Sequence, residues 1–193
     1  MKTLIVYYSR TGTTKTVAEL IQKGLNCDIE ELIDTKNRMG LFGYILGGRD
    51  AIRKIPTVIN KVNSDASKYD LIILGTPDWG STMAPALRTY ILDNKDKFKN
   101  IALFCTAGGS HHEGIIKEMG CLSDTVSIAS IGLRTKEVKS GEFVEKINTY
   151  VDFIKKHDVK PQSTKKTSEK RQVAKKSVKA KSVKTKKPVS KKK

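Results

Sequence analysis

Residues 3–14 read TLIVYYSRTGTT, an apolar run that leads directly into a loop rich in hydroxyl groups. The run at 3–8 does not alternate between apolar and polar residues, which is typical of a strand covered on both faces. Residues 15–23 then show helical spacing, and Gly24 is expected to end the helix. This order predicts a βα unit with its loop at the carboxyl end of the strand.

The same alternation continues through the first 157 residues. Further apolar, β-branched runs predict strands at 26–31, which is the weakest, and at 69–74, 101–105 and 125–131. Helical spacing predicts helices at 41–55, interrupted by Gly47-Gly48, and at 85–92 and 141–156. The pattern predicts an α/β fold, an open parallel sheet with helices on both faces. Such sheets bind ligands at the carboxyl ends of their strands.

The loop after the first predicted strand is the first candidate site, and it consists of Ser9, Arg10, Thr11, Gly12, Thr13 and Thr14. The first N–H groups of a helix have no partner within it, and the helix dipole favours an anion there. Hydroxyls at four of the six positions supply further donors, which favours a site for a phosphate monoester. The alternative is that these hydroxyls only cap the helix.

The loop at 8–14 resembles the phosphate loop of flavodoxins, usually written T/S-x-T-G-x-T. Two further stretches, LGTPDWGSTMAP at 74–85 and CTAGG at 105–109, are similar to the two flavin-ring loops of that family. They follow the expected strands in the expected order. The resemblance covers residues 1–157 and is to the short-chain type. It implies a five-stranded parallel sheet of strand order 2-1-3-4-5 and FMN as the cofactor.

The second of these loops presents Trp79, the single tryptophan of the chain, on a turn rich in Gly, Pro and Ser. The ring is expected to stack on the isoalloxazine, and the alternative is that it folds back into the core. Gly80 can adopt a positive φ at little cost. The resemblance implies that a peptide at 79–81, up to Ser81, reorients when the flavin is reduced. It also implies that the polar edge of the ring is lined by backbone groups of Thr76, Pro77 and Asp78.

The third loop departs from the family pattern. The resemblance places four of its residues beside the flavin, namely Thr106, Ala107, Gly108 and Gly109. Many flavodoxins cover the second flavin face with an aromatic residue, usually tyrosine, where this chain has His111 and His112. Either one imidazole, which we assign to His111, covers that face, or both are exposed and the flavin is half open.

Charge is distributed unevenly along the chain. The formal net charge is +17, and residues 158–193 account for +13 of it, against +4 for residues 1–157. The segment 158–193 has no aromatic residue and repeats the motif KSVK, so we expect it to be disordered. It is interpreted either as a solubilising extension or as an electrostatic tether to a polyanion, such as nucleic acid or an anionic membrane surface.

Apolar runs, the first residues and the cysteines indicate in which cellular compartment the protein is expected. No apolar run approaches the roughly 18–20 residues of a transmembrane helix, and the first residues do not resemble a secretory signal. Cys27, Cys105 and Cys121 form no CxxC pair, and each lies in an apolar stretch. We therefore expect reduced, mostly buried thiols in a cytoplasmic protein.

Two functions are consistent with the resemblance. The first is a non-catalytic electron carrier, in which bound FMN exchanges electrons with partner proteins, a reductase or ferredoxin-type donor and an unknown acceptor. The second is an NAD(P)H-dependent quinone or flavin reductase on the same fold, with the open third loop admitting a second substrate. The sequence contains no recognisable nicotinamide site, which favours the carrier. No residue is assigned as catalytic or as a metal ligand.

A further departure from the family is electrostatic. Flavodoxins are usually strongly acidic, whereas residues 1–157 carry +4 and Arg10 lies inside the phosphate loop. A nearby cation favours the anionic form of a reduced flavin. The sequence therefore argues against a very low reduction potential and against docking onto basic partner surfaces.

Overall fold

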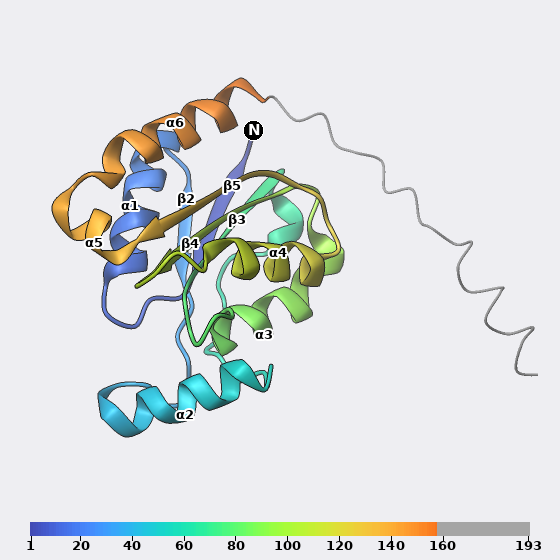
Figure 1. Cartoon of the computed structure of the whole chain (residues 1–193). Helices are drawn as coiled ribbons and strands as arrows, with labels where there is room; N and C mark the ends of the chain where they lie inside the picture. Colours follow the sequence, from blue (N-terminus) through green and yellow to red (C-terminus); the bar gives the residue numbers. More distant parts are fainter. Residues whose placement is uncertain (158–193) are drawn as a thin grey trace, which may run out of the picture. The chain divides into compact units, whose positions relative to one another are not determined.

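The computed structural model describes residues 1–157, and the predicted disordered segment 158–193 lies outside them. Five parallel strands form one sheet in the order β2-β1-β3-β4-β5, which confirms the predicted topology (Figure 1). Their bounds are β1 Thr3–Tyr7, β2 Asp28–Glu31, β3 Leu71–Pro77, β4 Ile101–Ala107 and β5 Ser127–Arg134. In the register of β1, Leu4 lies opposite Asp28 of β2 on one side and Ile72 of β3 on the other.

Helices cover both faces of the sheet. One face carries α1 Thr13–Leu25, α5 Thr135–Ser140 and α6 Phe143–Lys156, and the other carries α3 Pro85–Asn94 and α4 His112–Ser123 (Figure 1). Short 3-10 turns at Ala66–Lys68 and Lys95–Lys97 precede β3 and β4. The remaining helix, α2 Gly40–Ile52, follows β2 and packs against α3.

The central strands are buried on both faces of the sheet, which explains why their sequences are apolar without alternation. In β1, Leu4 and Val6 belong to one core cluster, whereas Ile5 and Tyr7 belong to the cluster on the opposite face. Every residue of β1 is buried. Full burial of one such aliphatic side chain contributes about 1.5–3 kcal/mol, so the two clusters together hold both helix layers onto the sheet.

Two expectations about α1 and α6 are corrected. Helix α1 continues through Gly24 and ends at Asn26, which adopts a left-handed conformation with φ 49°. Gly24 instead allows close packing, because a Cβ there would lie 3.0 Å from Cγ1 of Val151 in α6. Gly141, with φ 84°, ends the short helix α5, so α6 begins two residues later, at Phe143. The helices α4 and α5 have no counterpart among the predicted elements.

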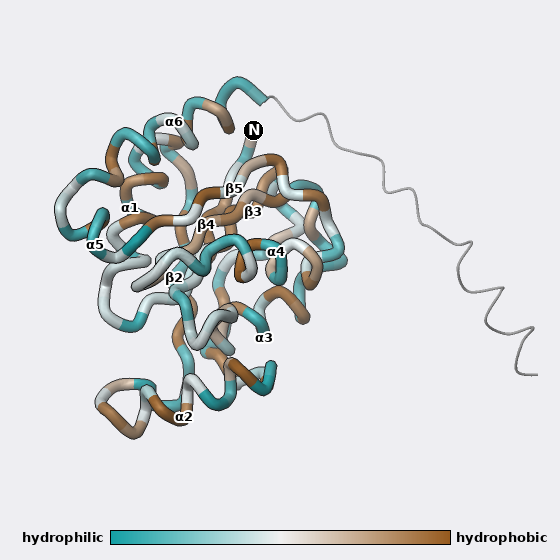
Figure 2. The backbone as a smooth tube through the Cα atoms, viewed as in Figure 1, coloured by the Kyte–Doolittle hydropathy of each residue, from teal (hydrophilic) through white to brown (hydrophobic). Residues whose placement is uncertain are grey.

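Helix α2 differs most from its predicted form. It runs without a break through Gly47-Gly48. An apolar stripe at helical spacing ordinarily faces the core, yet Leu41, Ile45, Ile52 and the following Ile55 are exposed. The buried face consists of small residues and one acid, namely Gly43, Gly47, Asp50 and Ala51. Figure 2 shows the hydrophobic residues along this helix.

The three thiols are free, but they are not all buried as expected. Cys105 is buried in β4, Cys27 is half-buried, and Cys121 is exposed on α4. Cys121 lies on the solvent side of an amphipathic helix, whose buried residues include Ile115 and Met119. Among residues 1–157, no helix combines the length and apolar character needed to cross a membrane.

Candidate functional site

A cleft of about 480 Å³ lies where the loops after β1, β3, β4 and β5 meet at the carboxyl edge of the sheet. This volume is within the range of small-molecule and cofactor sites. The lining residues are Arg10, Thr11, Thr13, Thr14, Tyr44, Pro77, Asp78, Trp79, Gly80, Ser81, Thr106, Ala107, Gly108, Gly109, His111 and Thr135. The cleft therefore collects all three loops that the sequence singled out.

The loop after β1 presents backbone donors at one end of the cleft. Gly12 has φ 89°, and the first helical bond of α1 runs from the N–H of Thr16 to the carbonyl of Gly12 at 2.9 Å. Within residues 1–157, no N–H group of residues 10–14 donates to another group of the protein. Free N–H groups at a helix N-terminus form a site for an anion such as phosphate.

Ser9 and Thr14 hold this loop in shape. The N–H of Lys15 donates to Oγ of Ser9 at 3.2 Å, so Ser9 caps the loop and does not line the cleft. Thr14 is buried, and its Oγ1 lies 2.8 Å from Oγ1 of Thr106, so the two hydroxyls share a hydrogen bond. This bond connects the first loop to the third across β3.

The loop after β3 makes a tight turn. Gly80 and Ser81 both have positive φ, 67° and 66° respectively, as the sequence predicted for Gly80. The N–H of Ser81 donates to Oδ1 of Asp78 at 2.7 Å, and the N–H of Trp79 donates to the carbonyl of Thr82 at 3.0 Å. The Asp78 carboxylate thereby stabilises a left-handed conformation that a serine would otherwise disfavour.

Thr76 supports this turn from beneath. Its Oγ1 accepts from the N–H of Ala84 at 2.9 Å and donates to the carbonyl of Pro77 at 2.9 Å. The side chain is buried and does not line the cleft. The side chain of Thr76 therefore sets the shape of the loop that lines the cleft, and contact of its backbone with a flavin ring stays a prediction.

Trp79 lies on the cleft wall but is largely packed. Its side chain is only 3 % exposed and belongs to the core cluster around α3 and β3. Tyr44 of α2 contacts it at a centroid distance of 5.6 Å, and Gly47 lies directly against the ring. The Arg10 guanidinium lies 4.9 Å from the Tyr44 ring centroid and 5.8 Å from that of Trp79. Stacking of Trp79 on a flavin stays a prediction.

The loop after β4 forms the opposite wall. Gly108 has open space around the position that a Cβ would occupy, so a ligand can approach its backbone. His111 is exposed at the cleft, whereas His112 is half-buried and packs against Gly132 of β5. Thr135 completes the wall, and its Oγ1 donates to the carbonyl of Ala107 at 3.1 Å.

Behind the turn at 78–82, Glu118 of α4 joins three segments of the chain. Its carboxylate accepts a hydrogen bond from Oγ1 of Thr82. It also accepts one from Nη2 of Arg88 at 2.8 Å and forms an ion pair with Nζ of Lys54 at 3.2 Å. Burial raises the pKa of this carboxyl, but the donors outweigh burial and lower the pKa to about 2. Glu118 therefore stays ionised and anchors the turn.

The sequence-predicted residues gather at this cleft with three exceptions, which are Ser9, Gly12 and Thr76. Each of these shapes a loop instead. Two lining residues, Tyr44 and Thr135, were not predicted. No motif marks either of them. Thr135 directly follows the carboxyl end of β5, where functional residues of such sheets concentrate, whereas Tyr44 lies within α2.

Solved structures share this architecture. A flavoprotein from Lactobacillus acidophilus NCFM, determined in complex with FMN, has a TM-score of 0.58 and 26% identity, covering 72% of this chain and 97% of that chain. The chain has the flavodoxin-like fold. A protein from Bacteroides uniformis ATCC 8492, described as a flavoprotein, has a TM-score of 0.64 and 21% identity, with 78% and 97% coverage. Oxidised flavodoxin 2 from Bacillus cereus has a TM-score of 0.53 and 20% identity, with 81% and 99% coverage.

Comparison with family models and with curated proteins found no match. The flavodoxin-like assignment therefore rests on strand order, on the position of the cleft, and on the structural neighbours.

Proposed function

We propose that this chain is an FMN-binding, flavodoxin-like electron-transfer protein. The observation that carries the proposal is the composition of the cleft. It joins a cluster of unpaired N–H groups at the start of α1 to two walls made by the loops after β3 and β4. The likeness to a flavoprotein that was solved in complex with FMN supports this ligand.

The residues fit the two parts of FMN. A phosphate monoester is a dianion with several acceptor oxygens, and the N–H groups of 10–14 with the hydroxyls of Thr11 and Thr13 are donors without acceptors on the cleft side. The loops after β3 and β4 line the rest of the cleft and would hold the planar ring. When bound, FMN supplies transfer of one or two electrons. The protein binds and orients it and excludes water from its packed side.

Arg10 contributes charge to this site. Its guanidinium is held over two aromatic rings at the cleft, where a cation stabilises added negative charge. An electron carrier with this residue is expected to hold a reduced flavin as its anion more readily than an acidic flavodoxin does.

The test separates phosphate recognition from ring recognition. Thr11→Ala should weaken FMN by about tenfold, as expected for one lost hydrogen bond to a charged group, and should leave riboflavin affinity unchanged. Titration with each flavin, followed by flavin fluorescence, measures both affinities. Thr149→Ala, an exposed threonine of α6, is the matched control. Equal weakening of both flavins by Thr11→Ala would contradict the placement of the phosphate.

A further inference from the structure

The outward face of α2 carries a concentrated apolar surface. Leu41 is 71 % exposed, Phe42 83 %, Ile45 58 % and Ile52 63 %. Leu41, Ile45 and Ile52 are spaced so that they form one stripe along the helix. Single exposed hydrophobic residues are common on proteins, whereas a continuous group of this kind marks an interaction site.

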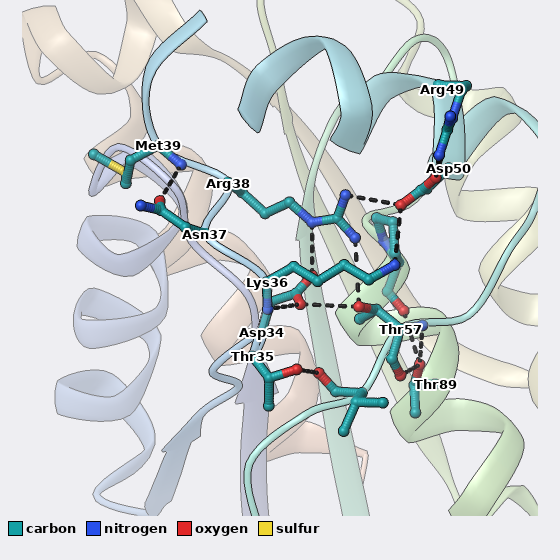
Figure 3. Close-up of polar contacts among 12 residues, drawn as sticks. Asp34, Thr35, Lys36, Asn37, Arg38, Met39, Arg49, Asp50, Thr57 and Thr89 are labelled. Atoms are coloured by element: carbon teal, nitrogen blue, oxygen red, sulfur yellow. Dashed lines mark hydrogen bonds and ion pairs between the residues drawn. The ribbon is translucent and has the colours of Figure 1, made fainter. Parts of the chain in front are cut away.

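The opposite face of α2 is fixed by a buried ion network, which prevents the helix from turning its apolar stripe inward. The Arg38 guanidinium donates to Asp34 at 2.9 Å and to Asp50 of α2 at 2.9 Å (Figure 3). Thr57 donates its hydroxyl to Asp34 at 2.9 Å and its N–H to Thr89 of α3 at 3.0 Å. Rotating the helix would leave buried charges unpaired, which is strongly destabilising.

The inner face of α2 has small side chains, so the space between α2 and the body has no room for the large apolar residues of its outer face. Gly43, Gly47 and Ala51 face inward with Asp50. A Cβ at Gly47 would overlap the Trp79 ring, so the helix sits as close to the body as its backbone allows. The apolar stripe is therefore exposed as a consequence of the packing, and no described residue covers it.

The charges around the stripe indicate its partner. Residues 34–61 contain six basic residues and two acidic residues, Asp34 and Asp50, both of which pair with Arg38. Arg49, Arg53 and Lys54 are exposed at the end of the helix, where Arg49 also pairs with Asp50 and Lys54 with Glu118. An apolar helical face with cations at one end, and no exposed carboxylate in its segment, suits contact with an anionic surface.

A second copy of the chain fits this face less well. A symmetric dimer through α2 would bring together two segments, residues 34–61, that each carry a net charge of +4. A membrane with anionic headgroups instead neutralises these charges. Weak interfacial contacts become stable when a second, polybasic contact is added, and residues 158–193 supply a sequence with net charge +13.

We propose that the outward face of α2 docks on the surface of an anionic lipid bilayer, with the lysine-rich segment 158–193 as a second contact. This proposal goes beyond flavin binding and does not depend on it. Tyr44 belongs to α2 and also lines the cleft, so docking through α2 brings the cleft close to the lipid surface.

The experiment is co-sedimentation of the full chain with vesicles of phosphatidylcholine containing about 30% phosphatidylglycerol. We expect binding to these vesicles and none to phosphatidylcholine alone. The triple variant Leu41→Ser, Ile45→Ser, Ile52→Ser should lower the partition coefficient by about tenfold or more, because three aliphatic contacts with the acyl region are lost. Phe42→Ser alone should lower it by about threefold or more.

A matched control removes three exposed apolar residues from other elements, in the variant Leu92→Ser, Val126→Ser, Val144→Ser. It should bind vesicles as the natural chain does. Circular dichroism and urea unfolding verify that every variant is folded. Vesicle binding that is unaffected by both the triple variant and Phe42→Ser would overturn the proposal, as would equal binding to uncharged vesicles.

Two further measurements would show whether the outward face of α2 has a different partner. A dimer in analytical ultracentrifugation that the triple variant dissociates, without vesicle binding, would assign the face to a second copy and overturn the proposal. The full chain could instead bind duplex DNA and not vesicles, with the same affinity in the triple variant. That result would show that the positive charges serve nucleic-acid binding, and it would also overturn the proposal. Each measurement is made without added flavin, so its failure is distinct from a failure of FMN binding.

Discussion

Single side chains determine the shape of the cleft loops. Thr76 and Asp78 hold the turn after β3, and the shared hydrogen bond of Thr14 and Thr106 joins the loops after β1 and β4. Each of these bonds contributes only about 0.5–1.5 kcal/mol, but a buried polar group without its partner costs more than that. The loops are thus positioned by polar groups that do not themselves need to touch a ligand.

The ion pairs of Glu118 lead to a prediction about pH. The pKa of Glu118 is lowered to about 2 from its ordinary value of 4.5, so the unfolded chain binds a proton more readily than the folded one. The stability that Glu118 contributes is complete above pH 4.5 and is lost as the pH falls toward 2. Glu118→Gln should lower the free energy of unfolding at pH 7 by about 1–2 kcal/mol.

Urea unfolding between pH 7 and pH 3 measures this effect. Glu118→Gln should show a smaller loss of stability with acid than the natural chain, because the titrating group is absent. Glu19→Gln, an exposed position of α1, serves as the control and should behave as the natural chain does. An unchanged slope in Glu118→Gln would mean that the pairs with Arg88 and Lys54 do not stabilise the fold.

At the scale of elements, α2 is held in place by its backbone and by buried charges. Asp50 is its one charged residue that faces inward, and it meets Arg38 from the preceding segment. Gly12, Gly80 and Gly141 adopt positive φ at turns and helix ends, whereas Gly47 serves a close approach between a helix and an aromatic ring. The orientation of this helix therefore depends on residues with little or no side chain.

Two adjacent glycines of α2 provide a test. Gly47→Ala should destabilise the protein by about 1–3 kcal/mol, because the new methyl group overlaps Trp79. Gly48→Ala should stabilise it by about 0.5–1 kcal/mol, since nothing lies near its Cβ position and alanine restricts the unfolded chain. Urea unfolding monitored by Trp79 emission measures both. Equal effects of the two substitutions would contradict the contact.

The elements differ in how far the sequence predicts them. Continuous apolar runs predicted the strands, because both faces of β1, β3 and β4 are covered. The orientation of α2 was not predictable from periodicity. Periodicity places Leu41 and Ile45 in the core, whereas the ion pairs of Arg38 with Asp34 and Asp50 hold the opposite face of the helix inward. The helix α4 begins at His112 and was not predicted, because its N-cap, His111, is not a preferred capping residue and makes no side-chain capping bond.

The same contrast holds for the cleft. Loop motifs predicted most of its lining, because the fold brings the carboxyl ends of the strands to one edge. They did not predict the packing of Trp79, which depends on Tyr44 and Gly47 from a helix that no motif connects to the loop after β3.

At the scale of the whole molecule, the open question of carrier against reductase has a direct test. If the protein is a carrier, NADH or NADPH alone should reduce the FMN-loaded protein at least about 100-fold more slowly than a ferredoxin or flavodoxin reductase does, since only the latter supplies a flavin electron path. Stopped-flow absorbance of the flavin measures both rates. Rapid, saturable oxidation of NAD(P)H coupled to a quinone would instead establish a reductase.

The position of β1 between β2 and β3 has a consequence during synthesis. It leaves the ribosome before both neighbours, and β2 can pair with one of its edges soon afterwards, but its other edge waits for β3. Parallel strands cannot be joined by a hairpin, so translation must continue through α2 and the loop after it before Leu71–Pro77 is available. Throughout that interval the nascent chain carries a bare, apolar strand edge, which is the form most prone to aggregate. We therefore expect the rate of translation between residues 32 and 70 to affect how long this edge of β1 stays unpaired.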